Sequence, residues 1–153
     1  MKSYNFRLER VLDYRQGLER EVQQELAECE RNLLEKKQRL EFLQMEHVKT
    51  QSALKNTEEK ILNLDELLML SSYLYYLERK IEEQEEIILK CEEEVSKIQE
   101  KVKAAMQQRK TLEKLKEKDY RIFQAEVNAE ENKVIDEAGL RMFLQAKSEL
   151  NCN

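Results

Sequence analysis

Apolar residues recur every three to four positions along two long stretches of the chain. In the first stretch, from Val22 to Leu68, steps of four and three mark fourteen positions, of which ten are apolar. In the second, from Leu74 to Leu112, such steps mark twelve positions, again with ten apolar. A 3.5-residue repeat keeps one narrow apolar seam on a helix, and only another helix in a left-handed coiled coil buries it. The pattern predicts two long helices with one seam each.

The two seams are out of phase with each other. The step from Leu68 to Leu74 is six residues, which no alternation of threes and fours contains. We therefore predict a chain reversal there, with Ser71 or Ser72 capping the second helix. The fold predicted is all-α, a long antiparallel two-helix coiled-coil hairpin. It forms a single domain over residues 1–153, with helix one at about 4–70, the turn at about 69–73 and helix two at about 72–147. One uninterrupted helix is the alternative, against which the step of six argues.

The predicted reversal also fixes which seam residues face each other. Facing residue numbers should add up to about 142, so that Leu64 faces Leu77 and Ile61 faces Ile81. Thr57 then shares a layer with Gln84, and a shared polar layer penalises slipped registers.

The predicted register keeps the candidate metal-binding side chains apart. It places Cys29 and Cys91 roughly 30 Å apart, at about 1.5 Å per residue, too far for a disulfide. It places His47, the only histidine, opposite Val95 and remote from both thiols. We therefore predict no metal site.

Composition excludes several classes of function. Charged residues make up 39% of the chain, there is no proline, and the net charge is −5. A nucleic-acid-binding protein normally carries a basic excess, which this chain lacks. Two glycines cannot supply a glycine-rich phosphate loop. A two-helix hairpin also has no enclosed cavity. We therefore predict no enzymatic activity, no cofactor, no small-molecule substrate and no nucleic-acid partner.

The sequence lacks membrane-spanning and secretory features. The longest apolar run, Leu67 to Leu70, is far shorter than a membrane span, and the N-terminus has no apolar signal segment. Three cysteines, an odd number, fit a reducing compartment. These features favour a cytoplasmic protein.

Three of the six tyrosines, Tyr73, Tyr75 and Tyr76, crowd the predicted start of helix two. Tyrosine is favoured at protein interfaces because its ring is apolar and its hydroxyl is polar. The cluster either binds a partner or plugs the end of the hairpin, and the sequence leaves both interpretations open.

Three motifs, in this order, resemble the flagellar export protein family FliJ. They are Tyr4-x-Phe6-x-Leu8-x-x-Val11-Leu12-x-Tyr14-Arg15, then Tyr73-Leu74-x-x-Leu77-Glu78-x-x-Ile81-x-x-Gln84, then Arg109-Lys110-x-Leu112-Glu113-x-Leu115-x-Glu117-Lys118 followed by Ile135-Asp136-Glu137. Together they cover nearly the whole chain.

The resemblance implies a component of the flagellar type III export apparatus, with a role in flagellum biogenesis and hence in motility and chemotaxis. FliJ-like proteins resemble the central stalk of rotary ATPases. The resemblance implies three partners: the hexameric export ATPase, the cytoplasmic part of the membrane export gate protein, and export chaperones. It also implies a location in the cytoplasm, peripheral at the inner face of the cell membrane.

The resemblance assigns candidate residues to two contacts. By motif position, the gate-binding residues are Tyr73, Leu77, Lys80 and Gln84. The predicted register buries Leu77 and Gln84, which makes Tyr73 and Lys80 the better candidates. By analogy with rotor stalks, the paired termini enter the ATPase ring, with Phe6, Arg7, Arg10 and Arg15 at that end.

Two other functions fit a coiled coil. One is a homodimeric cytoplasmic scaffold, and the other is a DNA-associated coiled coil without enzymatic activity. A stalk is a monomer folded back on itself, whereas a scaffold is a parallel dimer of nearly twice that length, so sedimentation and small-angle scattering distinguish them.

Overall fold

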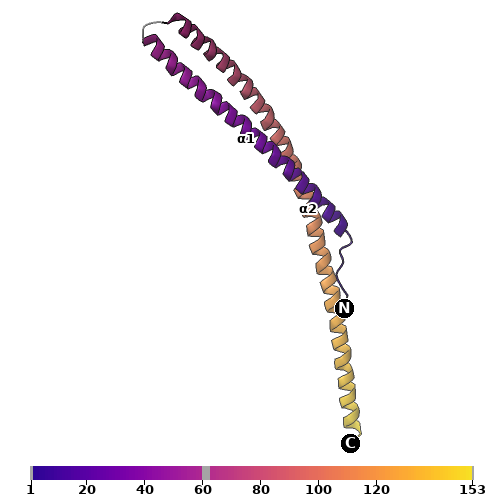
Figure 1. Ribbon diagram of the computed structural model, residues 1–153. Coiled ribbons are helices and arrows are strands. Elements are labelled where there is room, and N and C mark those ends of the chain that lie inside the picture. The colour runs from indigo at the N-terminus through magenta and orange to yellow at the C-terminus, as the bar shows by residue number, and fades with distance from the viewer. Residues whose placement is uncertain (1, 60–62, 153) are drawn as a thin grey trace. The chain divides into compact units, whose positions relative to one another are not determined.

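A computed structural model describes residues 2–59 and 63–152 (Figure 1). Helix α1 spans Glu9–Glu59 and helix α2 spans Leu64–Asn151, and the described residues contain no strand. The all-α hairpin of two long helices is therefore confirmed. The chain divides into two compact units, one made of Met1–Gly17 with Met106–Asn153 and the other of Leu18–Ala105. The expectation of one domain over residues 1–153 stays a prediction.

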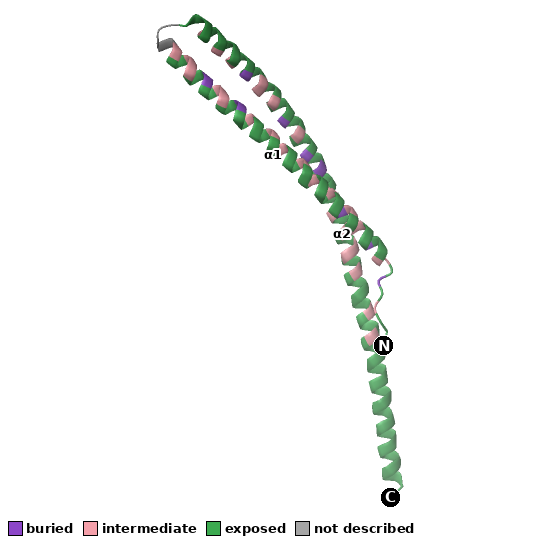
Figure 2. Ribbon diagram, viewed as in Figure 1, coloured by how far each residue is buried: buried purple, intermediate pink, exposed green. Residues whose placement is uncertain are grey.

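The Leu18–Ala105 unit contains the antiparallel pair of helices. His47 of α1 contacts Glu78 of α2, whereas Asn32, earlier in α1, contacts Cys91, later in α2. Every predicted seam position from Val22 to Thr57 and from Leu74 to Leu112 is buried or half-buried (Figure 2). The 3.5-residue periodicity therefore identified the buried side of both helices correctly.

The predicted turn is wrong. Residues 69–73 lie inside α2, α1 ends at Glu59 rather than near 70, and Leu64 and Leu68 are exposed. The leucines between residues 64 and 70 fit two seams. Leu64 and Leu68 continue the first seam, whereas Leu67 and Leu70 continue the 3–4 spacing of the second seam backwards from Leu74. The structure follows the second seam, with Leu67 and Leu70 half-buried.

Asn63 and the acidic residues that follow it explain why α2 begins there rather than at Ser71 or Ser72. The Leu67 amide donates to the Asn63 carbonyl at 3.1 Å, which places Asn63 at the N-cap, a position that asparagine favours. Asp65 and Glu66 then fall in the first turn, where negative charge is stabilised by the helix dipole. Glu66 also stands three residues after the cap, the spacing of a capping box.

The predicted register is also wrong, because α2 begins at Leu64 rather than near residue 72. Contacting residues across the two helices have numbers that add up to about 124, rather than 142. Gln84 does not share a layer with Thr57; its Nε2 donates to the Lys36 carbonyl of α1 at 3.0 Å. Leu64 is exposed, so it does not face the buried Leu77, and Ile61 lies outside the described residues.

The shifted register also brings the two seam cysteines together. Asn32, one turn from Cys29, lies with its amide nitrogen 3.9 Å from the Cys91 sulfur. Burial, nearby glutamates and Cys91 itself raise the pKa of the Cys29 thiol. The expectation of a separation near 30 Å is therefore wrong. Both thiols are free.

The first helix begins later than predicted. Residues 2–6 are not helical, and α1 starts at Glu9 rather than near residue 4. Lys2 contacts Glu130 and Glu9 contacts Lys116, so this segment passes about 21 Å of α2 at 1.5 Å per residue. Seven residues reach that far only when nearly extended. We call residues 2–8 the N-terminal strap. It lies beside α2 within its own unit (Figure 1).

Candidate functional site

The four residues assigned to gate binding divide between the surface and the seam. Tyr73 is 39% exposed and Lys80 is half-buried, whereas Leu77 is only 2% exposed. Gln84 is half-buried and donates to the Lys36 carbonyl. Because Leu77 and Gln84 hold the two helices together, Tyr73 and Lys80 are the two of the four that a partner can reach.

Tyr76 joins these two accessible residues; the sequence placed it in the tyrosine cluster but not among the residues assigned to gate binding. The rings of Tyr73 and Tyr76 stack with centroids 6.2 Å apart, and the Lys80 ammonium lies 5.7 Å from the Tyr76 centroid. Lys80 also pairs with Glu83 at 3.2 Å. Stacking and cation–π contacts fix the rings before any partner arrives, which reduces the entropy lost on binding. The missed signal is the i, i+3, i+7 spacing of Tyr73, Tyr76 and Lys80, which puts all three on one side of a helix.

The tyrosine cluster does not plug the end of the hairpin. Helix α2 begins at Leu64, so Tyr73 stands more than two turns inside it, and the expectation that it starts the helix is wrong. Tyr75 is 63% exposed and Tyr76 is 52% exposed. Two aromatic side chains left this open have little packing role, which favours the interface interpretation.

The residues expected at the ATPase end differ in their accessibility. Phe6 is 6% exposed and lines a groove with Leu115 and Ile122 of α2, so it packs within its own unit. Arg15 donates to the Gln108 side chain at 2.7 Å. Arg7 and Arg10 are exposed and remain available to a partner.

The N-terminal strap is fixed by every second residue. The Tyr4 ring lies 5.0 Å from that of Tyr120 and 5.3 Å from that of Phe123, and its hydroxyl bonds to Asp119. Burial and then the Asp119 bond raise the pKa of Tyr4. Together with Lys2 and Phe6, Tyr4 forms a period-two pattern, typical of an extended segment with one face on its neighbour. That pattern was readable at the N-terminus, where a helix was expected instead.

The Lys2–Glu130 ion pair holds the far end of the strap at 2.8 Å. The hydrogen bond between them raises the pKa of Lys2 and lowers the pKa of Glu130. Both side chains are exposed, so the pair is worth little stability and mainly sets where the strap ends.

The last part of α2 exposes many large apolar side chains. All residues from 128 to 152 are exposed (Figure 2). The apolar ones include Val134, Ile135, Leu140, Met142, Phe143 and Leu144. Several large apolar side chains exposed on one stretch of helix are typical of a surface that a partner covers.

Neither a cluster of metal ligands nor a membrane-spanning helix occurs in the described residues. No group of three or more His, Cys, Asp or Glu side chains within 2–59 and 63–152 is arranged to hold a metal ion. Neither helix, over the part that the structure describes, is both long and apolar enough to cross a membrane.

Comparison with known proteins identifies the family. No curated protein and no solved structure matches the chain. A family model described as flagellar FliJ protein matches residues 4–148 of the 153. This range contains all three motifs on which the resemblance was based. The chain therefore belongs to the flagellar FliJ protein family and is a component of flagellar protein export.

Proposed function

We infer that this protein is a non-enzymatic stalk and adaptor of the flagellar export apparatus. It joins the hexameric export ATPase ring to the membrane export gate, binds export chaperones, and works in the cytoplasm at the inner face of the cell membrane. The observation that carries this proposal is the family match over residues 4–148. The folded-back pair of helices fits this proposal, because the family resemblance implies a stalk similar to that of rotary ATPases.

The unit containing both termini is the part proposed to enter the ATPase ring. Its exposed apolar residues on α2 after residue 128 support this role, since a surrounding ring would cover them. Arg7 and Arg10 add exposed positive charge at the strap and at the start of α1. Phe6 takes part only indirectly, by keeping Arg7 in place.

The Leu18–Ala105 unit is the part proposed to contact the gate. Tyr73 and Lys80 are the accessible residues there, and Tyr76 links them. Leu77 and Gln84 contribute by keeping α2 on α1. The motif alone assigns Tyr73, Lys80, Leu77 and Gln84 to gate binding. In this proposal Tyr73 and Lys80 contact the gate, and the other two hold the helices together.

A homodimeric scaffold is less well supported. A parallel dimer of this kind buries each seam against the same seam of a second chain. Here the seam of α1 meets that of α2 within one chain, through pairs such as His47 with Glu78. Sedimentation of the purified chain should therefore give a monomer, and a parallel dimer would support the scaffold.

The ATPase contact is tested by adding the purified chain to the purified export ATPase and measuring ATP hydrolysis. Wild-type protein should stimulate hydrolysis, and the double variant Arg7→Glu, Arg10→Glu should stimulate it several-fold less. Arg39→Glu, which reverses a charge in the other unit, is the control and should act as wild type. Equal stimulation by a folded Arg7→Glu, Arg10→Glu protein would show that these arginines do not face the ring.

A further inference from the structure

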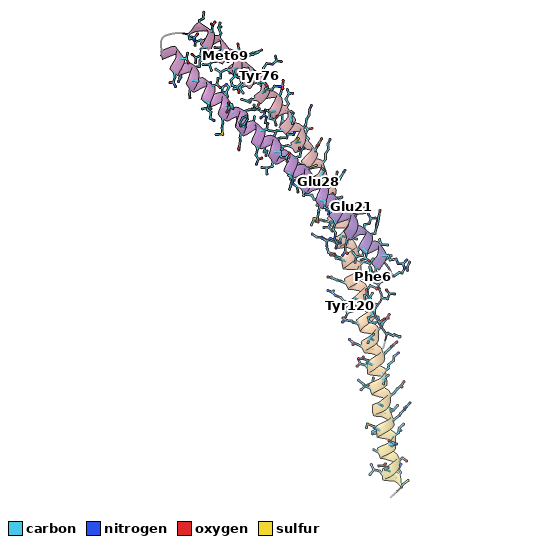
Figure 3. The ribbon with its side chains drawn as sticks, viewed as in Figure 1. Phe6, Glu21, Glu28, Met69, Tyr76 and Tyr120 are labelled. Atoms are coloured by element: carbon cyan, nitrogen blue, oxygen red, sulfur yellow. The ribbon has the colours of Figure 1, made fainter. Side chains whose placement is uncertain are left out.

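A second heptad stripe runs along α2 beside the buried seam. Its residues follow one another at steps of four, three, four, three and four: Met69, Tyr73, Tyr76, Lys80, Glu83 and Ile87. Each stands one position before a seam residue, which is a rotation of about 100° around the helix. All lie in one unit, and Figure 3 labels Met69 and Tyr76 along this stretch of α2.

Four of the six stripe residues are apolar or aromatic, and α1 leaves much of the stripe uncovered. Met69, Tyr73, Tyr76 and Ile87 are all exposed. The polar members Lys80 and Glu83 neutralise each other through their ion pair. The Lys80–Glu83 pair therefore presents no net charge to an apolar partner, and the Lys80 ammonium lies over the Tyr76 ring.

The spacing identifies the kind of partner. A 3.5-residue repeat matches another helix in coiled-coil geometry, whereas a loop or a strand would not follow it over five steps. The stripe spans about 27 Å at 1.5 Å per residue, which a partner helix of about 18 residues covers.

The charge around the stripe narrows the partner further. Between Asp65 and Ile87 the chain has seven acids and two bases, a net charge of −5. Complementary charge steers association and suppresses wrong partners. The matching helix therefore carries apolar residues at 3–4 spacing and lysine or arginine along its margins.

We propose that the Met69–Ile87 stripe docks one basic-flanked amphipathic helix from the cytoplasmic part of the export gate, with Tyr73 and Tyr76 as anchors. The choice of gate protein rests on the proposed function. The helical docking mode and the roles of Met69, Tyr76 and Ile87 go beyond it. Leu77 and Gln84, which the motif suggested, are replaced by exposed neighbours one residue earlier on the same helix.

The chain supplies matched control residues. Tyr75 stands two positions after Tyr73, and Leu89 stands two positions after Ile87, so each lies about 200° around the helix from its counterpart. Both are exposed. Alanine at either position removes a similar side chain from a side of α2 that lies outside the stripe.

The test is titration of full-length variants with the purified cytoplasmic part of the gate protein. Tyr76→Ala should weaken binding about thirtyfold, as loss of an interface anchor does, and Ile87→Ala should weaken it several-fold. Tyr75→Ala and Leu89→Ala should stay within about twofold of wild type, and wild-type affinity should fall as salt rises. Circular dichroism checks that all four variants remain folded.

A photo-crosslinking amino acid at 69, 76 and 87 tests the docking mode independently. The crosslinked gate residues should advance in steps of three or four through a single segment of about 18 residues. Crosslinks scattered over separate segments would overturn helical docking.

The outcomes also separate this inference from the proposed function. If Tyr73→Ala weakens binding but Tyr76→Ala and Ile87→Ala do not, the gate contact stands and the stripe is wrong. If wild-type protein does not bind the gate at all, the proposed gate function fails and the inference fails with it.

Discussion

Leu77 shows how a single position can be misassigned by motif. By motif it is a gate residue, yet it is the most buried large side chain of the described residues, at 2% exposure. Tyr76, its neighbour, is exposed and stacks on Tyr73. On a helix, adjacent residues point about 100° apart, so a shift of one position changes a binding residue into a core residue.

Leu77→Ala should therefore destabilise the protein rather than act on binding alone. Loss of a buried leucine costs about 2–5 kcal/mol, and partial collapse of a thin two-helix seam favours the lower end. Urea denaturation followed by circular dichroism measures it. The exposed Leu89→Ala is the control, expected within about 0.5 kcal/mol of wild type. A Leu77→Ala protein of normal stability that fails to bind the gate would return Leu77 to the binding surface.

The end of the N-terminal strap should release in acid. The Glu130 pKa is lowered in the folded protein, so its pairing with Lys2 stabilises the docked strap above the ordinary glutamate pKa of about 4.3. This stabilisation disappears as pH falls through the lowered folded pKa. The NMR signals of Lys2 should then shift towards those of a free chain, while Tyr4, held by Tyr120 and Phe123, keeps its ring contacts.

The variant Lys2→Met is the control for this titration. It should show no comparable shift at residue 2 over the same pH range, because Glu130 then has no lysine to release. Simultaneous loss of the Tyr4 contacts in the wild-type protein would mean that the ion pair holds the whole strap.

At the level of helices, periodicity predicted which sides are buried but not where α2 begins. Every seam residue from Val22 to Thr57 was predicted correctly because the 3.5-residue repeat depends on local spacing alone. The turn was not, because Leu64 and Leu68 extend one seam while Leu67 and Leu70 extend the other. The cap at Asn63 with Asp65 and Glu66 decides between them, whereas Ser71 and Ser72, the predicted caps, lie inside α2.

The cap makes a stability prediction. Asn63→Ala should cost about 1 kcal/mol, because an N-cap side chain accepts a bond from an amide of the first turn. Ser71→Ala should be neutral or slightly stabilising, since Ser71 lies inside α2 and alanine is the better helix former. Thermal denaturation of both variants gives the comparison. A larger loss from Ser71→Ala would restore the turn near residue 70.

The register makes a second prediction for the same helices. In a Cys29→Ala background, Leu33→Cys should be joined to the native Cys91 within one chain by a short thiol crosslinker, because residue 32 already contacts Cys91. The pair Leu64→Cys with Leu77→Cys, which the register predicted from sequence brings together, should not be joined. Denaturing gels resolve the two results, and crosslinking of the second pair alone would contradict the observed register.

For the whole molecule, the sequence predicted the fold class and the family, and the structure changed the candidate sites. The order of three motifs around Tyr4, Tyr73 and Arg109 was enough to identify FliJ. It could not show that Phe6 is buried or that Tyr76 links Tyr73 to Lys80, because both depend on which helix faces are covered. Each of the two units is therefore proposed to bind its own partner.

The most direct test of this account is a bridging experiment. The cytoplasmic part of the gate protein is immobilised, the export ATPase is added with or without this chain, and the ATPase retained is measured. We predict retention only when the chain is present, little retention with Tyr73→Ala, and full retention with Tyr75→Ala. If the chain binds each partner separately but never retains the ATPase on the gate, the adaptor function is contradicted.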